Sequence, residues 1–434
     1  MDGNKQRVVV IGGGFAGLNF VKHIDAGKFD VTLIERNNYH SFPPLFYQVA
    51  SSGLDPSSIC FPLRRELRKR HGGRVAFNMG EVTEIDVARR IVTTSRGKVP
   101  YDFLVLAAGT TNNFFGMPEL VDEVFTIKST AEALRCRNEI LSLLERAAIE
   151  PDAARRRRLL SFVVVGGGPS GVEIAGALGE MKKYVLPREY PTISPDDISI
   201  TLIEGSDKVL GSMSADSSEA AARSLRDLMV DLRLGATMSR YSDGRVTLAD
   251  ESSIPASMVV WTAGVKAEGF NLTSGGVPLG KDVTGRAGRF PVDRFCRVSG
   301  LPDVFAIGDI ALVTDDTDYP KGHPQLAQVA IQQGRLLARN LNRDSVDTGE
   351  WKYFSYKDRG AMATIGRNRA VVDLKHLRFH GFAAWLVWMF IHLISILGMR
   401  NKIAVLVNWI WAYFNYSTSL RLLISPARHP RRRS

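Results

Sequence analysis

Short apolar runs, each closed by glycine-rich sequence, set the pattern of the first three quarters of the chain. Val8–Ile11 is continuously apolar, as strands buried on both faces of a parallel sheet are, and Gly12–Gly17 follows it. A short helical stretch comes next, and a second apolar run follows it and ends at Glu35. The same plan recurs at Ser161–Val165, which leads into Gly166–Gly171 and a longer helical stretch. Two βαβ units of this kind predict an α/β protein with two Rossmann-like dinucleotide-binding domains.

Later apolar runs that end in small-residue turns extend both units and place the domain boundaries. These runs are residues 102–110, 258–265 and 304–311. We expect the second nucleotide-binding domain to be inserted into the first, and a C-terminal segment that begins β-rich and continues helical to follow them. The predicted boundaries are 1–115 and 282–340 for the first domain, 116–281 for the second, and 341–434 for the C-terminal segment.

Two apolar stretches in the C-terminal segment differ from the rest of the chain. Residues 382–397 contain only His392 and Ser395 as polar residues, and residues 403–414 contain only Asn408. Because a helix needs about 20 apolar residues to span a bilayer, neither stretch is long enough. Both carry tryptophans, which favour the headgroup region, so we expect amphipathic helices that lie in the membrane interface. The interface of a homodimer or a buried core hairpin is the alternative, and this role can coexist with membrane binding. The tryptophans are Trp385, Trp388, Trp409 and Trp411.

The net charge of +11 is unevenly distributed along the chain. Beyond the last acidic residue, Asp373, there are nine lysines and arginines, whereas the preceding residues carry 47 basic and 45 acidic side chains. The basic character therefore belongs to the tail. A nucleic-acid-binding protein would carry a basic groove on its folded body, so an anionic membrane surface is the expected partner and nucleic acid is not.

The three cysteines exclude several classes of protein. Cys60, Cys136 and Cys296 lie far apart and form no CxxC pair, which argues against a disulfide scaffold, a zinc ribbon and a dithiol relay. We expect no metal site and a reducing compartment. The sequence also runs directly from residue 7 into an apolar strand, which leaves no room for a signal peptide.

The first glycine motif has the parts that a dinucleotide requires. Gly12 permits the tight turn, Gly14 lets backbone N–H groups approach a pyrophosphate, and Gly17 lets helix and strand pack closely. The helix N-terminus adds partial positive charge for the phosphates. Glu35, at the end of the next strand, can accept hydrogen bonds from ribose hydroxyl groups.

The second glycine motif repeats these parts, with Glu204 at the end of its second strand. This carboxylate would accept a hydrogen bond from a ribose 2′-hydroxyl and would repel a 2′-phosphate. No arginine follows at residues 205–208 to bind such a phosphate. We therefore expect NADH to be preferred over NADPH.

Residues 306–309 (AIGD) end a strand in Gly-Asp and place a carboxylate at a turn. This resembles the flavin signature of the two-dinucleotide-binding-domain flavoprotein reductases, in which the aspartate meets FAD. Within that superfamily the chain is similar to the type II NADH dehydrogenases, single-subunit NADH:quinone oxidoreductases that pump no protons. The similarity spans almost the whole chain. Its further motifs are residues 44–50 (PLFYQVA), 107–110 (AAGT), 261–265 (WTAGV) and 327–334 (AQVAIQQG), the last resembling the family's quinone-site motif.

The resemblance implies that the first motif binds FAD, that the second binds NADH, and that Glu173 assists quinone access or proton supply. The implied FAD contacts are Gly12, Gly13, Gly14, Phe15, Ala16, Gly17, Glu35, Arg36, Ala108, Gly109, Asp309, Ala327 and Gln328. The implied NADH contacts are Gly166, Gly168, Pro169, Ser170, Gly171, Glu173, Glu204, Ala263 and Gly264. The implied localisation is peripheral, on the cytoplasmic face of the plasma or inner membrane.

The quinone-site motif also has a physical reading of its own. Pro324 suits the first turn of a helix, so a helix is expected from about Pro324 to Asn340 with its N-terminus near Gln325. Gln328 and Gln332 are then one turn apart on the same face. Their uncharged amides can donate to quinone carbonyls without the cost of burying a charge.

Two other functions remain open at this point. Sulfide:quinone oxidoreductases share the architecture but use a redox-active cysteine pair and need no second nucleotide site. A non-enzymatic redox sensor would bind NADH and report it through a change of shape.

Overall fold

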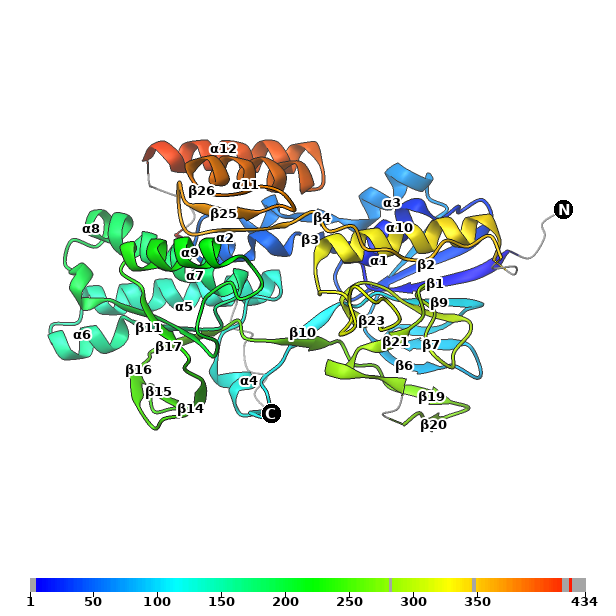
Figure 1. The fold of residues 1–434 in the computed structure, drawn as a ribbon, viewed down its shortest axis with the longest axis horizontal. Helices are drawn as coiled ribbons and strands as arrows, with labels where there is room; N and C mark the ends of the chain where they lie inside the picture. Colours follow the sequence, from blue (N-terminus) through cyan, green and yellow to red (C-terminus); the bar gives the residue numbers. More distant parts are fainter. Residues whose placement is uncertain (1–4, 281–282, 346–348, 416–420, 424–434) are drawn as a thin grey trace, which may run out of the picture. The chain divides into compact units, whose positions relative to one another are not determined.

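The computed structural model describes residues 5–280, 283–345, 349–415 and 421–423, which fold into two compact units (Figure 1). Each unit is assembled from separate stretches of the chain. Unit 1 comprises Met1–Ser41, Cys60–Thr111 and Val265–Arg359; unit 2 comprises Phe42–Ile59, Asn112–Gly264 and Gly360–Ser434. Of the nine basic residues that follow Asp373, Arg428 and Arg431 to Arg433 lie outside the described residues.

A five-stranded parallel sheet is the centre of unit 1, in the order β22-β9-β1-β2-β5. β9, β22 and the Val8–Ile11 part of β1 are continuously apolar, as expected for strands covered on both faces, and Val8, Val10, Leu104 and Val105 are fully buried. Helices α1 and α10 pack against each other beside it. The bounds are β1 Gln6–Ile11, β2 Phe29–Glu35, β5 Val75–Met79, β9 Phe103–Leu106, β22 Val304–Ala306, α1 Phe15–His23, α3 Leu63–His71 and α10 Ala327–Arg343.

Smaller strand groups complete unit 1. A five-stranded sheet has the order β20-β19-β6-β7-β8, and β21-β23 and β3-β4 form two further pairs. The bounds are β3 Tyr39–Ser41, β4 Cys60–Pro62, β6 Val82–Asp86, β7 Ile91–Thr94, β8 Gly97–Pro100, β18 Val265–Ala267, β19 Leu272–Ser274, β20 Val277–Pro278, β21 Phe290–Val292, β23 Ala311–Val313, and the 3-10 helices η6 Arg286–Gly288 and η7 Gly308–Ile310.

Unit 2 repeats the first plan with a four-stranded parallel sheet in the order β13-β12-β11-β17 and an antiparallel sheet β14-β15-β16. The glycine turn lies between β11 and α7, as predicted. The bounds are η1 Pro43–Leu45, α2 Phe46–Ala50, η2 Pro56–Ser58, β10 Thr110–Asn112, α4 Leu120–Glu123, α5 Thr130–Ala148, α6 Ala153–Leu159, β11 Ser161–Val165, α7 Pro169–Glu180, the π-helix η3 Met181–Val185, α8 Leu186–Glu189, η4 Pro195–Asp197, β12 Ser199–Glu204, α9 Ala215–Asp227, β13 Asp231–Leu234, β14 Met238–Ser242, β15 Arg245–Leu248, β16 Ser253–Pro255 and β17 Met258–Trp261.

The C-terminal part of unit 2 is an antiparallel sheet, β24 (Ala361–Thr364), β25 (Ala370–Asp373) and β26 (Arg378–Gly381), followed by α11 (Phe382–Ser395) and α12 (Met399–Asn415). It packs on the nucleotide-binding part of the same unit: α7 contacts β24 and α9 contacts β25. Asp373 accepts hydrogen bonds from the N–H and hydroxyl of Ser214, which precedes α9.

The compact units divide the described chain at other positions than the predicted domain boundaries, which stay a prediction. Residues 360–415 belong to unit 2, because β24 and β25 pack on α7 and α9. Residues 42–59 also belong to unit 2, since α2 packs on α5 and α7. Residues 265–280 belong to unit 1, where β19 pairs with β6.

The start of α10 corrects one prediction. The helix begins at Ala327, three residues after Pro324, because Leu326 is extended (φ −124°, ψ 146°) and serves as the N-cap. Gln325 does not open the helix; its amide donates to the carbonyl of Asp309 at 3.0 Å.

Candidate functional site

The first glycine turn in unit 1 is shaped for a ligand. Gly12 has φ +106°, and a Cβ there would clash with the Ala107 carbonyl. A Cβ at Gly17 would strike the Gly12 carbonyl, so this glycine is needed for helix packing. Gly14 instead faces open space, with no protein atom within 4 Å of a Cβ position. Gly14 is the N-cap of α1, and no side chain caps this helix end. The backbone N–H groups of Phe15 and Ala16, in the first turn, can therefore bind phosphate oxygens.

Glu35 is fixed at this turn by backbone donors. Its Oε2 accepts a hydrogen bond from the Gly13 N–H at 2.7 Å and its Oε1 one from the Asn37 N–H at 3.1 Å. A carboxylate has about four lone-pair positions, so acceptor capacity for a ribose hydroxyl remains. Arg36, the next predicted residue, is largely exposed and pairs with Glu268 at 3.4 Å.

His40 supports the same turn and was not predicted. It is buried, and its Nδ1 lies 2.9 Å from the Gly13 carbonyl, which can only accept, so Nδ1 carries the proton. Burial lowers the pKa of His40 to about 4, so the ring is neutral at physiological pH. Its edge-to-face contact with Phe15, at 5.4 Å between centroids, fixes the first residue of α1. A single histidine in a β-rich stretch carries no sequence signal for this role.

The Gly-Asp turn after β22 contacts helices α1 and α10 of unit 1. Gly308 has φ +76°, its N–H donates to Gln333 Oε1 at 2.7 Å, and a Cβ there would lie 2.9 Å from that of Ala16. The turn therefore places Asp309 beside the starts of α1 and α10. Asp309 is close enough to Arg289 to oppose the lowering of the Arg289 pKa that burial causes. Gln333, which the sequence analysis left without a role, positions this turn.

The remaining predicted FAD residues lie around these elements. Ala108 and Gly109 follow β9, and Gly109 has φ +74° and accepts from the Glu268 N–H at 3.1 Å. Ala327 and Gln328 begin α10.

Gln328 and Gln332 are already engaged within unit 1. Gln332 bonds the backbone of Lys357 with both ends of its amide, Nε2 to the carbonyl at 2.9 Å and Oε1 to the N–H at 3.0 Å. Gln328 Oε1 accepts from the Arg359 N–H at 3.0 Å. The two residues thus fasten residues 357–359 along α10. Their assignment to quinone binding stays a prediction.

The second glycine turn, in unit 2, has the same geometry as the first. Gly166 has φ +108° and lies against the backbone of Ala263, and a Cβ at Gly171 would strike the Gly166 carbonyl. Gly168 is open and caps α7 without a side-chain hydrogen bond, so the first turn, with Pro169 and Ser170, can accept phosphates.

Glu204 occupies the position in unit 2 that Glu35 has in unit 1. Its Oε2 accepts from the Gly167 N–H at 2.5 Å, and its Oε1 accepts from the N–H and hydroxyl of Ser206, both at 2.8 Å. Gly264 has φ +72°, and a Cβ there would strike the ring of Phe115. The strand-end turn predicted at residues 263–264 therefore needs its glycine.

Glu173 is a buried carboxyl group in the first half of α7. Burial raises its pKa well above the ordinary value, and the hydrogen bond from the Thr364 N–H only partly opposes this. Burial therefore favours the protonated carboxyl group, which is the form that can donate a proton. Close packing of Gly176 on Gly366 brings β24 to this side of α7.

A cavity of about 150 Å³ lies within unit 2, between α2, α7, β24 and the two C-terminal helices. Tyr47 and Trp388 meet edge to face at 6.4 Å, and Trp388 and Trp409 lie 5.9 Å apart. Gln48 donates to the Tyr47 hydroxyl at 2.7 Å and accepts from Trp409 Nε1 at 2.8 Å. Flat aromatic walls with a few polar groups suit a planar ring that carries oxygen atoms. The main lining residues are Tyr47, Gln48, Glu180, Arg367, Trp385, Trp388, Trp409 and Tyr413.

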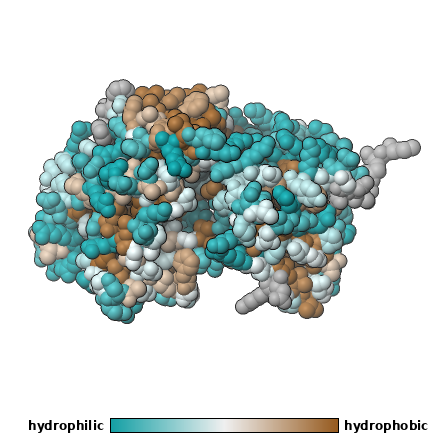
Figure 2. All heavy atoms as spheres, viewed as in Figure 1, coloured by the Kyte–Doolittle hydropathy of each residue, from teal (hydrophilic) through white to brown (hydrophobic). Residues whose placement is uncertain are grey.

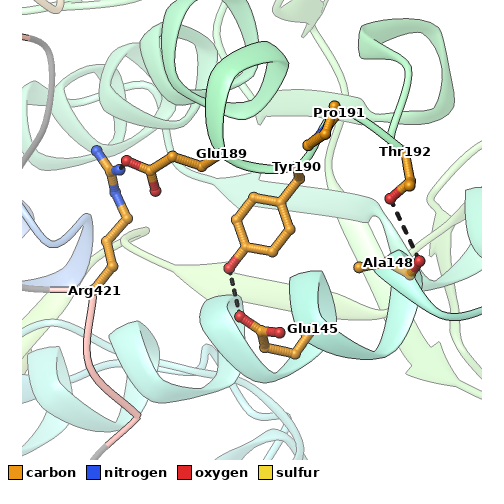
Figure 3. A pocket seen from close by; sticks show the side chains of 7 residues that line it. All are labelled: Glu145, Ala148, Glu189, Tyr190, Pro191, Thr192 and Arg421. Atoms are coloured by element: carbon orange, nitrogen blue, oxygen red, sulfur yellow. Dashed lines mark hydrogen bonds and ion pairs between the residues drawn. The ribbon is translucent and has the colours of Figure 1, made fainter.

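A second, larger cavity of about 440 Å³ in unit 2 is polar and open (Figure 3). Tyr190 donates to Glu145 at 2.7 Å across it, and Arg421 pairs with Glu189. None of its lining residues belongs to the predicted sites, and it lacks the apolar walls of a cofactor pocket. Among the described residues, no group of three histidine, cysteine, aspartate or glutamate side chains could hold a metal ion.

The two C-terminal helices expose their apolar side chains. Figure 2 shows this hydrophobic surface over α11 and α12. On α12, Asn401 is buried and bonds the Ser57 carbonyl, whereas Ile403 and Trp411 are more than half exposed. Val405 is buried beside Asn401, so α12 packs on the protein through one side while large apolar side chains cover its outer side, unlike a helix on a water-exposed surface. No helix in the described part of the chain is long and apolar enough to cross a membrane. The large apolar residues of α11 and α12 that are at least half exposed are Phe382, Phe390, Met399, Ile403, Val407, Ile410 and Trp411.

Comparison with known families accounts for nearly the whole chain. Residues 6–334 match the model of the pyridine nucleotide-disulphide oxidoreductases, and residues 359–415 match the NDH2 C-terminal domain.

Several relatives of similar length are NADH or NAD(P)H oxidoreductases. The chain is 35% identical over 422 residues to the type II NADH:quinone oxidoreductase Ndh of Mycobacterium tuberculosis, covering 93% of this chain and 87% of that protein. It is 31% identical to an internal alternative NAD(P)H-ubiquinone oxidoreductase of Arabidopsis thaliana mitochondria, covering 95% and 85%.

Solved structures share the fold. NDH2 of Plasmodium falciparum in complex with NADH superimposes with a TM-score of 0.88 at 20% identity, covering 97% of this chain and 100% of that one. The sulfide:quinone oxidoreductase of Aquifex aeolicus has a TM-score of 0.71 at 17% identity, covering 95% and 96%. At these identities the likeness concerns the fold alone.

Proposed function

Because this chain belongs to the type II NADH:quinone oxidoreductases, we propose that it oxidises NADH through FAD and passes two electrons to a membrane quinone. The observation that carries the proposal is the pair of matching glycine turns, each opening onto free space at an uncapped helix and each held by a carboxylate. One chain thus has two dinucleotide sites, one for a resident flavin and one for a nicotinamide. FAD, when bound, accepts a hydride and releases electrons to the quinone.

Unit 1 would hold the FAD. The N-terminus of α1 binds its pyrophosphate, Glu35 its adenosine ribose, and Asp309 its ribityl-pyrophosphate region. The turn around Gly308 supports this assignment, because it brings Asp309 next to the first residues of α1.

Unit 2 would hold NADH in the same way. The first turn of α7 binds the pyrophosphate and Glu204 accepts from the ribose 2′-hydroxyl. A 2′-phosphate would bring two negative charges against a carboxylate that three donors already hold in place, so NADPH would bind less well.

Quinone would be reduced with protons that Glu173 helps to supply. The aromatic cavity of unit 2 provides a path for the quinone, because two of its walls are the helices that expose apolar residues. Gln328 remains the proposed contact for a quinone carbonyl on α10, while the amide of Gln332 holds Lys357.

Attachment to a membrane would be peripheral, through the apolar faces of α11 and α12. An acceptor dissolved in lipid makes this geometry useful, and the cytoplasmic face is the proposed side because NADH is found there. The same faces offer a surface for a homodimer.

Anaerobic titration tests the function. Purified protein with bound flavin is mixed with NADH, the flavin absorbance is followed, and a short-chain quinone is then added. We expect rapid bleaching followed by recovery. A colourless protein that does not take up FAD, or a reduced flavin that quinone fails to reoxidise, would contradict the proposal, and the latter would favour a redox sensor.

The sulfide:quinone alternative is less well supported. Burial raises the pKa of Cys136 to about 12 and raises that of Cys296 as well, so neither thiol supplies the thiolate that sulfide chemistry needs. Bleaching of the flavin by sulfide but not by NADH would restore this alternative.

A further inference from the structure

Helix α3 of unit 1 carries a local excess of positive charge. The chain as far as Asp373 is nearly neutral overall, yet five of the nine residues of α3 are arginine or lysine. The one acidic residue of the helix, Glu66, pairs with Lys22 of α1 at 2.6 Å and is only 15% exposed. The exposed cations of α3 are therefore not neutralised within the helix. They are Arg64, Arg65, Arg68, Lys69 and Arg70.

Three of these cations form the outer side of the helix. Leu63 and Leu67 are buried one turn apart and attach α3 to the unit. Arg65, Arg68 and Lys69 are three and four residues apart on the opposite side, where all three are exposed. In the described part of the chain, none of these three side chains forms an ion pair with a carboxylate. We call these three residues the α3 basic face.

The stability of the helix does not account for this arrangement. Arg64 and Arg65 are in the first turn, where the helix dipole disfavours cations. Arg65 and Lys69 are a like-charge pair at i and i+4, as are Arg64 and Arg68, and such pairs destabilise a helix. The ring of Phe77, 4.8 Å from the guanidinium of Arg64, offsets part of this effect. Charges that weaken a helix point to a partner of opposite charge.

The positive surface continues from α3 to α10 around His23, the last residue of α1. Burial lowers the pKa of His23, and the charges of Arg335, Arg70 and Arg339 lower it further. Arginines of two helices therefore lie near one residue. Arg335 and Arg339 are exposed and one turn apart on α10, which has no acidic residue. The positive charge thus covers more of unit 1 than a single helix.

A single-stranded nucleic acid is the less suitable partner for this surface. Proteins that bind single strands offer exposed aromatic rings on which bases stack. Phe77 and Phe61, the rings under Arg64 and Arg65, are buried and cannot serve in this way. An extended layer of phosphate groups needs only exposed positive charge, which the α3 basic face provides.

The chain also links α3 closely to the apolar helix α12. Asn401 of α12 contacts the Ser57 carbonyl at 3.5 Å, and Arg64 follows Ser57 by seven residues. A chain of that length spans at most about 25 Å. Chain length alone therefore keeps α3 near a bilayer on which α12 rests.

We propose that the α3 basic face binds the phosphate headgroups of anionic lipids and adds an electrostatic contact to the attachment by α11 and α12. This inference rests on the proposed function, in which the acceptor is dissolved in lipid. Each lysine or arginine near an anionic surface strengthens binding about fivefold, so three of them contribute roughly a hundredfold. The apolar helices would bind any bilayer, whereas the basic face would favour an anionic one.

Vesicle flotation of the full chain tests this proposal. The wild type and the triple variant Arg65→Gln, Arg68→Gln, Lys69→Gln are mixed with vesicles of phosphatidylcholine, either alone or with about one third phosphatidylglycerol. We expect the variant to bind the anionic vesicles about a hundredfold more weakly and the neutral vesicles as the wild type does. Added salt should reduce the wild-type preference for anionic vesicles, because ions screen exposed charges.

Two further variants separate charge from its position. The triple variant Arg146→Gln, Arg155→Gln, Arg158→Gln removes the same charge from exposed residues of unit 2 and should bind anionic vesicles as the wild type does. The double variant Arg65→Lys, Arg68→Lys keeps the charge and should keep the anionic preference.

Flavin content and NADH oxidation in detergent show whether the α3 variants remain intact. Leu63 lies on the buried side of α3, with its side chain 2.9 Å from a Cβ position at Gly13 in the first glycine turn. The α3 basic face is on the opposite side of the helix, so its variants should bind flavin and reduce it with NADH as the wild type does.

Four results would overturn the lipid contact. They are wild-type binding of anionic vesicles by the α3 triple variant, an equal loss in the unit 2 variant, loss of binding in the lysine variant, and loss of flavin, which would assign the charges to the nucleotide. Tighter wild-type binding to a short RNA duplex than to anionic vesicles would assign the face to nucleic acid instead. A wild type that binds neither kind of vesicle would overturn the proposed membrane attachment, and one that binds vesicles but reduces no quinone would overturn the proposed reaction.

Discussion

The carboxylate of Glu204 accepts a hydrogen bond from the Gly167 N–H at 2.5 Å, and Glu35 makes the same bond to Gly13 at 2.7 Å. Each acidic residue therefore has two roles. It fixes the second glycine of the turn, and it presents its remaining lone pairs to a ribose. Loss of either carboxylate should affect the shape of the turn as well as the choice of nucleotide.

Glu204→Gln should reduce the discrimination against NADPH. The amide keeps an oxygen that can accept from Gly167 but removes the negative charge that repels a 2′-phosphate. We expect the ratio of kcat/KM for NADPH to that for NADH to rise about tenfold, which corresponds to about 1.4 kcal/mol. Asp231→Asn, an exposed carboxylate at β13, is the control. An unchanged ratio would remove the basis for the cofactor choice.

Gly14 and Gly17 should respond differently to alanine. Gly14→Ala adds a methyl group where no protein atom lies within 4 Å, so the apoprotein should keep its melting temperature and lose affinity for FAD. Gly17→Ala drives a methyl group into the Gly12 carbonyl and should destabilise the fold by about 1–3 kcal/mol. Flavin absorbance and thermal unfolding of the apoprotein measure the two effects. Equal melting temperatures for both variants would contradict the geometry.

Glu173→Gln should stabilise the protein at alkaline pH. The folded-state pKa of Glu173 is raised above its unfolded value, so its contribution to stability is present at low pH and is lost as pH rises through the folded pKa. The amide resembles the protonated acid at every pH. We expect the melting temperature of the variant to exceed that of the wild type by several degrees near pH 9 and to match it near pH 4. The opposite trend would show that the buried carboxyl is ionised.

Charged substitutions on α11 and α12 should weaken membrane binding. Phe390 is 61% exposed and Ile403 is 55% exposed, so Phe390→Glu and Ile403→Glu remove apolar contact with lipid without disturbing the core. Burial of such a side chain is worth about 1.5–3 kcal/mol, so each should lower partition into vesicles at least about tenfold. Val277→Glu, at a residue 68% exposed in unit 1, controls for added charge. If both variants partition into vesicles as well as the wild type does, the membrane attachment must lie outside α11 and α12.

Alanine substitutions at Gln328 and Gln332 should have different effects on stability and on quinone kinetics. Gln332→Ala removes two hydrogen bonds to Lys357 and should cost about 2 kcal/mol of stability, at roughly 1 kcal/mol for each bond. Gln328→Ala should raise KM for quinone more than it lowers stability. Denaturant unfolding and steady-state quinone kinetics measure the two. Quinone kinetics unaltered by Gln328→Ala would count against this contact.

The two βαβ units could be predicted because their signals are local. An apolar strand, a glycine turn and an acidic strand end lie within one short stretch, and the roles of Gly12 and Gly166 follow from backbone sterics. The helix start at Ala327 could not be predicted in this way, because a contact between Gln325 and the distant Asp309 holds the chain extended there.

The cavity residues were also beyond sequence reasoning. Gln48 and Trp409 are remote in the sequence and meet only because α2 and α12 fold into the same unit. His40 and Gln333 act through a single buried hydrogen bond each, and such bonds have no characteristic spacing. Sequence patterns thus located the two glycine turns, while the aromatic cavity depends on tertiary contacts.

Arg367 ties the final turn of α12 to the β24–β25 turn beside α7, and the same helix is a wall of the aromatic cavity. The proposed acceptor pocket is therefore partly built from the helix that we propose to rest on lipid. Extraction of the protein from bilayers with harsh detergent should impair quinone turnover before it impairs flavin reduction. The choice of solubilising conditions will therefore decide whether the purified protein retains quinone reduction as well as NADH oxidation.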